Sequence, residues 1–160
     1  MQETAQLAGF FAAHGIWCVS DGGPLTPLLG VEHADGSRGM HRFVVDDLGE
    51  AARAGQKALR NNEDGAARAV LVVDGYVHLE TGRTDALIIE AVDHGSGGSV
   101  TVAVPYRPEQ TPGGFAVHRP KFLDVPARLD LRDLGAAFFT GVAAHEKAAT
   151  VWNDHLDESV

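Results

Sequence analysis

Apolar residues recur along this chain at two different periods, which predict a mixture of helices and strands. A spacing of three or four residues predicts a first helix that stops at Gly15. Its inward face would consist of Leu7, Phe10, Phe11 and His14. The same spacing returns from Leu131 to Leu156 and predicts one long amphipathic helix with His145 on its apolar stripe.

A further helix is predicted between these two. Asp47 can cap its start, and Glu50 stands three residues later, as in a capping box. Its inward residues are small, from Leu48 to Leu59, so the helix has to lie close to its support. The polar run 61–65 ends it.

Runs rich in β-branched and aliphatic residues predict an antiparallel meander. Asp74-Gly75 separates two such runs and is a strong hairpin signal, so a turn is expected there. Short strands are predicted at 16–20 and on both sides of a turn at 34–39. The remaining predicted strands cover 85–93, 100–106 and 115–119.

These elements together predict an α+β fold. We expect an antiparallel β-meander sheet of about five to seven strands, packed against helices that include the long C-terminal amphipathic helix. The chain has 160 residues, 44% of them hydrophobic, which is enough for one domain covering 1–160 with a sizeable core.

Charge and cysteine content narrow the possible partners and compartment. A formal net charge of −9 repels phosphate backbones and anionic lipid, so neither nucleic acid nor a membrane is an expected partner. Arg outnumbers Lys, as in proteins from G+C-rich bacterial genomes. The single Cys18, with no secretory signal and no apolar span, predicts a bacterial cytoplasmic protein.

Eight histidines raise the possibility of a metal site, but their spacing fits no ligand motif. A turn centred on residues 82 and 83 would place His78 opposite Leu87, so that His78 and Glu90 point to opposite faces of the sheet. The nearest possible ligand group consists of His78, Glu80, Glu90 and His94. We therefore expect no metal and no cofactor.

Two residues are candidates for catalysis. Glu90 lies in an apolar run, where burial would favour the neutral acid and suit acid–base chemistry, unless it pairs with an arginine or a backbone donor. His145 is either a general base or a core residue with one hydrogen-bonded ring nitrogen. Cys18 has no basic neighbour in sequence, and is expected to pack as a small hydrophobe.

A local basic cluster stands out in this acidic chain. Its members are Arg107, His118, Arg119 and Lys121. If strand 100–107 pairs with 115–119, these side chains gather at one end of the sheet, where they can hold a phosphate, a carboxylate or an acidic segment of a partner. Arg107, His118 and Arg119 are therefore candidate ligand-binding residues. The alternative is scattered surface charge without a specific role.

No motif specifies a reaction, and the first functional hypothesis is therefore a non-catalytic binding or accessory protein. It would self-associate as a homo-oligomer, most simply a dimer, through an exposed apolar patch. The patch would combine Phe139 and Val151 with Phe10 or Phe11.

Two further hypotheses come from other classes. One is a small enzyme or ligand-binding domain that takes an anionic small molecule between the sheet and the last helix, with Glu90, His145 and His118 as its polar groups. The other is an acidic immunity or antitoxin-like protein that blocks a basic partner protein.

Overall fold

The computed structural model describes residues 1–160 and contains four helices and seven strands. In chain order the elements are α1 (Gln2–Val19), β1 (Leu28–Glu32), β2 (Arg38–Arg42), α2 (Leu48–Asn61), β3 (Arg68–Leu79), β4 (Gly82–Asp93), β5 (Ser99–Arg107), β6 (Ala116–Val117), β7 (Lys121–Asp124), α3 (Leu131–Ala144) and α4 (Glu146–Asp154). None of the helices combines the length and hydropathy that a membrane span requires.

The strands form one antiparallel sheet in the order β2-β1-β3-β4-β5-β6, and β7 also pairs with β5. The long central pair is β3 and β4, of twelve residues each. This arrangement confirms the predicted α+β class with an antiparallel sheet of five to seven strands. The hairpin predicted around 34–39 is also present, as β1 paired with β2.

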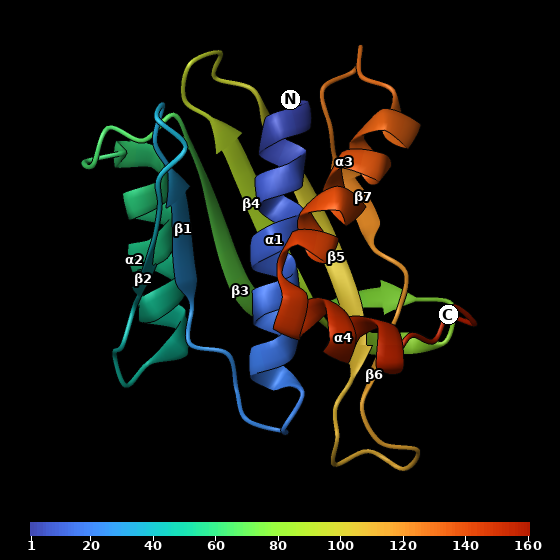
Figure 1. The fold of residues 1–160 in the computed structure, drawn as a ribbon. Helices are drawn as coiled ribbons and strands as arrows, with labels where there is room; N and C mark the ends of the chain where they lie inside the picture. Colours follow the sequence, from blue (N-terminus) through green and yellow to red (C-terminus); the bar gives the residue numbers. More distant parts are fainter.

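Helices cover the two faces of the sheet unequally (Figure 1). α1 crosses the middle of one face with α3 and α4 beside it, whereas α2 lies alone on the other face, behind β1. The first face closes over a core cluster of 24 buried residues, and the α2 face over a cluster of 6. Alternation along the strands produces this division, since neighbours such as Val70 and Leu71 point to opposite faces.

Close contact between α1 and α3 joins the two ends of the chain. A Cβ atom on Gly9 would lie 1.8 Å from the backbone oxygen of Phe138, and one on Gly141 would lie 1.8 Å from that of Gln6. Only glycine allows the two backbones to approach this closely. The packed helix pair therefore depends on both glycines.

α1 is longer than the sequence predicted. The strand expected at 16–20 is wrong, because α1 continues to Val19. Gly15 does not end the helix. It faces the sheet, where a Cβ would lie 2.8 Å from Leu87 Cδ1, so its role is to let α1 approach β4. Tertiary packing overrides the β propensity of Ile16 and Trp17 here.

The turn expected at Asp74-Gly75 is also wrong, because β3 runs through both residues. Their strand partners in β4 are Leu87 and Ala86. The Tyr106 hydroxyl, from β5, donates to both carboxylate oxygens of Asp74, at 2.8 and 3.0 Å. A partner 32 residues away thus satisfies a side chain that would otherwise favour a turn.

The single long C-terminal helix is in fact two helices. His145 has an extended backbone (φ −93°, ψ 87°) and separates α3 from α4, while its Nδ1 accepts the Ala148 N–H at 3.3 Å. The predicted apolar stripe is buried from Leu134 to Val142, whereas Leu131 at its start is exposed. Beyond the break its phase shifts, and Ala148 and Trp152 are the buried residues.

The start of α2 matches its prediction. Asp47 Oδ1 accepts the N–H groups of Gly49 and Glu50, at 2.7 and 3.3 Å. At the other end Asn62 adopts a left-handed conformation and closes the helix. The buried side of α2 is made of Ala51, Gly55 and Leu59.

Candidate functional site

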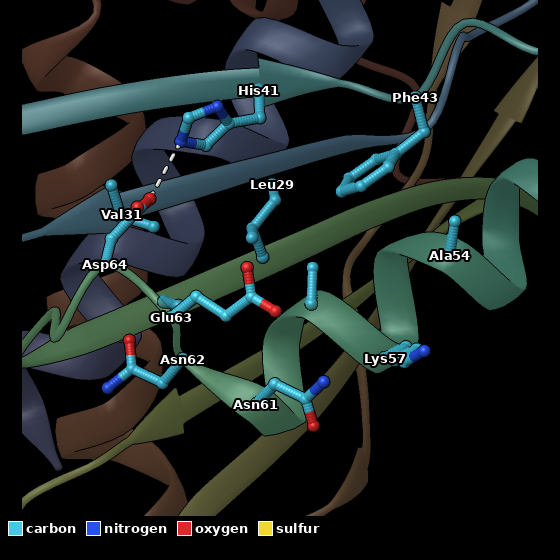
Figure 2. Close-up of a pocket in the computed structure, with 12 residues that line it drawn as sticks. Leu29, Val31, His41, Phe43, Ala54, Lys57, Asn61, Asn62, Glu63 and Asp64 are labelled. Atoms are coloured by element: carbon cyan, nitrogen blue, oxygen red, sulfur yellow. Dashed lines mark hydrogen bonds and ion pairs between the residues drawn. The ribbon is translucent and has the colours of Figure 1, made fainter.

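The largest cavity lies between α2 and the β1–β2 hairpin, and we call it the α2 pocket (Figure 2). It has a volume of about 420 Å³, within the range of small-molecule sites. α2 creates it by presenting Ala54 and Ala58 where larger side chains would fill the space. Its apolar walls are completed by Leu29, Val31, Phe43 and Ala69.

Polar groups line one side of the α2 pocket. His41 Nε2 lies 3.0 Å from Asp64 Oδ2, in an ion pair with both side chains more than half exposed. Glu63 lines the pocket just after α2, and Asn61 and Lys57 project from the last turns of the helix (Figure 2). Neither Glu63 nor Lys57 makes an ion pair within the chain. The pocket thus combines an apolar interior with free charges at its rim.

Glu90 lies on the α2 face of the sheet, outside the α2 pocket. It is half-buried, faces Leu71 across the β3–β4 ladder, and accepts a long hydrogen bond of 3.5 Å from Gln56 Nε2. The actual register pairs His78 with Arg83, four residues from the predicted Leu87. Because the actual and predicted registers differ by an even number of residues, each side chain stays on its predicted face of the sheet. His78 and Glu90 therefore still point to opposite faces.

His145 lies on the opposite side of the sheet, against α1. Its Nε2 is 3.0 Å from His14 Nδ1, and the rings of Phe10 and Trp17 pack around the pair. Glu90 and His145 therefore do not share a cavity, and the structure does not form the common pocket expected between the sheet and the last helix.

The contacts of the His14–His145 pair define its protonation. Because His145 Nδ1 accepts the Ala148 N–H, the proton of its neutral ring is on Nε2 and is donated to His14 Nδ1. The His14 proton is then on Nε2, which is buried and has no partner. Burial lowers the pKa of both histidines. A further proton on His14 Nδ1 or on His145 Nδ1 breaks the hydrogen bond that this nitrogen accepts.

Cys18, which lies on α1 with His14, is not positioned to form a reactive thiolate. Burial raises the pKa of its thiol, which outweighs the opposite effect of Arg42. Its partly buried side chain packs against the main core cluster, as a small hydrophobe does.

Arg107, His118 and Arg119 of the predicted basic cluster lie at one end of the sheet, because β5 pairs with β6 as expected. Lys121 does not join them, since it lies on β7 opposite Ala103, in the middle of β5. The three clustered residues contact the acidic residues that follow α4. Arg107 Nη1 lies 3.6 Å from Asp157 Oδ2, and Arg119 Nη2 lies 3.6 Å from Glu158 Oε2. His118 is 4% exposed, and its Nδ1 donates to the Asp157 carbonyl oxygen at 2.9 Å.

Arg107 and His118 also line a second cavity, of about 330 Å³, which we call the basic pocket. Arg83 and Tyr106 are among its other lining residues, whereas Arg119 lies outside it. Arg83 was missed by the sequence analysis. Its place follows from the β4–β5 register, which the sequence did not define.

Comparison of the chain with protein-family models, curated proteins and solved structures gave no match. The candidate sites are therefore described from their own geometry.

The α2 pocket was also missed by the sequence analysis. The available signal was the run of small residues in α2, which indicated close packing but not that Ala54 and Ala58 would leave a space beside it.

The apolar patch predicted for self-association is not formed as expected. Phe11 is buried, and Phe10 is half-buried against His145. Phe139 is exposed, whereas Val151 is partly buried against the core.

Proposed function

We propose that this chain is a non-catalytic binding protein and that its ligand occupies the α2 pocket. The observation that carries the proposal is the combination of an apolar cavity of about 420 Å³ with unpaired charges at its rim. Cavities of this kind hold small ligands by burying an apolar body and orienting a few polar groups.

The rim favours a ligand with an apolar body and an ammonium group. Leu29, Val31 and Phe43 offer the apolar surface, and Glu63, whose carboxylate has no ion-pair partner, is part of the same lining (Figure 2). The net charge of −9 also attracts cations to the protein as a whole.

The test compares 2-phenylethylamine with its uncharged analogue 2-phenylethanol by saturation-transfer NMR. We expect the amine to bind more tightly, and Glu63→Gln to remove most of that preference, about fivefold for one exposed charge pair. Ala54→Trp fills the pocket from the helix surface and should abolish binding of both compounds. Arg53→Trp, on the same helix but outside the pocket, is the control. Equal binding to both tryptophan variants would contradict the proposal.

A second candidate function is self-association with another copy of this chain. β2 pairs only with β1, so its outer edge has no partner strand. Apolar side chains are exposed beside that edge, with Val44 81% exposed. The set consists of Met40, Val44, Val45 and Leu48. Exposed apolar groups beside a free edge strand are characteristic of interfaces.

Sedimentation velocity over a range of protein concentrations tests this second function. The wild-type chain should form dimers, and Val44→Asp should shift it to monomers without loss of secondary structure. Tyr76→Asp replaces a large side chain that is 51% exposed and lies away from this edge, and it should leave the dimer intact. A wild-type chain that stays monomeric at high concentration would exclude self-association.

A further inference from the structure

The basic pocket is a second site, independent of the α2 pocket, at the opposite end of the strand order. Its cationic groups are Arg83 and Arg107, from β4 and β5. The Arg83 guanidinium is held 4.0 Å above the Tyr76 ring, and Arg107 Nε donates to the Gly114 carbonyl at 2.7 Å. These contacts orient both guanidinium groups before any ligand binds.

The pocket also contains neutral groups that suit an oxyanion. The side chains of Thr81, Thr84 and Thr111 line it. Because His118 Nδ1 donates to a carbonyl, Nε2 is the ring nitrogen left without a hydrogen-bond partner in the chain. Asp85 is the one acidic residue in the lining.

Residues 155–160, which we call the acidic segment, lie along the same site. The segment runs beside β6 through two backbone hydrogen bonds, from Val117 N–H to His155 O at 2.9 Å and from Asp157 N–H to Val117 O at 2.8 Å. Val160 lines the basic pocket, and the Asp157 carboxylate approaches Arg107. A carboxylate of the chain itself thus lies beside one of the two guanidinium groups of the pocket.

The ion pairs of the acidic segment are weak, whereas its backbone hydrogen bonds to β6 are short, at 2.8 and 2.9 Å. Both of its ion pairs are 3.6 Å long, and the side chains of Arg119 and Glu158 are more than half exposed. Ion pairs of this kind contribute little to stability. An anion with two or three oxygens can therefore compete with Asp157 for the Arg107 guanidinium.

We propose that the basic pocket binds a small molecule through a phosphate or carboxylate group, held by Arg83, Arg107 and His118, and that the acidic segment competes with it. This inference does not depend on the α2 pocket or on the ligand proposed there.

The experiment measures inorganic phosphate binding by isothermal titration calorimetry at constant ionic strength. The double variant Asp157→Asn/Glu158→Gln should bind phosphate about fivefold more tightly than the wild-type chain, because it removes the carboxylate beside Arg107 and the neighbouring negative charge of Glu158. The matched control is Asp46→Asn/Glu50→Gln, which changes the net charge equally at two exposed residues that line neither pocket. Its affinity for phosphate should be unchanged.

A second variant tests whether the phosphate binds beside Arg83. Arg83→Gln should weaken phosphate binding at least about tenfold, since a guanidinium–phosphate contact is a charge-assisted hydrogen bond. Arg83 is the preferred variant because Arg107 also supports the loop at Gly113 and Gly114. Circular dichroism confirms that each variant is folded.

Parallel titrations with citrate and with chloride distinguish the ligand class. Binding of phosphate or citrate that depends on Arg83 supports the proposal, and shows which oxyanion the site prefers. The proposal is overturned if phosphate binds no better than chloride, or if the Asp157/Glu158 and Asp46/Glu50 double variants bind phosphate equally well.

Discussion

The two faces of the sheet are closed to different degrees, although the strands between them are the same. Three helices cover one face, and its core includes large, fully buried side chains such as Phe138 and Trp152. The other face has only α2, whose alanines leave the α2 pocket open. Substitutions on the closed face should therefore affect stability, and those around the pocket should affect binding.

The largest effect is expected where α1 crosses α3. Gly141→Ala places a Cβ 1.8 Å from the Gln6 carbonyl oxygen, and neither backbone can move without separating the helices. We expect a loss of about 3 kcal/mol or more in the free energy of unfolding, measured by urea denaturation. Gly135→Ala, in the same helix, meets no atom within 4 Å and should stabilise the protein by about 0.5–1 kcal/mol. Similar effects at both positions would contradict the proposed crossing.

The two phenylalanines on opposite faces provide the next comparison. Phe138 is fully buried on the closed face, so Phe138→Ala should cost about 3–5 kcal/mol. Phe43 is half-buried and borders the open pocket, so Phe43→Ala should cost about 1–2 kcal/mol, because less apolar area is lost. Thermal unfolding of both variants checks the difference. Equal losses would show that the α2 face is as tightly packed as the other.

The closed face should also be sensitive to acid. The lowered pKa of His14 and His145 means that the unfolded chain binds more protons below the ordinary histidine value of 6.5. The contribution of the pair to stability is complete above that pH and is lost as the pH decreases through it. Allowing for partial exposure, we expect a loss of about 1 kcal/mol between about pH 7.5 and about pH 5.5.

Variants separate this pair from the other histidines. His14→Gln/His145→Asn removes both titrating rings while asparagine retains a capping side chain for α4, so its stability should change less with pH. His33→Gln should keep the pH dependence of the wild-type chain. An unchanged pH profile in the double variant would rule out the pair as its source.

The smallest effect is expected at the rim of the α2 pocket. His41→Gln removes an ion pair whose side chains are 55% and 53% exposed, and should change the free energy of unfolding by less than about 0.5 kcal/mol. Chemical denaturation checks this. A larger loss would mean that the rim helps to hold the hairpin to α2, and that ligand-binding data on rim variants need correction for stability.

Local signals in the sequence predicted the elements whose ends are defined by nearby residues. The Asp47 cap and the β1–β2 turn are of this kind, since all their partners lie within a few residues. The Asp74-Gly75 turn was wrong because the hydroxyl of Tyr106 on β5 satisfies Asp74. Gly15 was misinterpreted because its role depends on Leu87 of β4.

The candidate sites also differ in whether they depend on residues that are near or distant in sequence. The basic cluster was predictable because Arg107, His118 and Arg119 lie at the ends of two strands that pair as expected. Its contact with Asp157 required the position of the segment after α4, which local patterns do not determine. The α2 pocket was not predictable, because a cavity depends on the distance between elements that are far apart in sequence.

The pairing of Gly9 with the α3 backbone has a consequence for synthesis of the chain. α1 leaves the ribosome first, but its partner α3 follows only after the whole sheet has been made. At about 5–20 residues per second, roughly 6–22 s separate the end of α1 from the start of α3. During this interval one side of α1 has only the incomplete sheet to pack against. A nascent chain paused after β7 should therefore be cleaved by protease within α1 and recruit chaperones, until translation resumes and delivers α3.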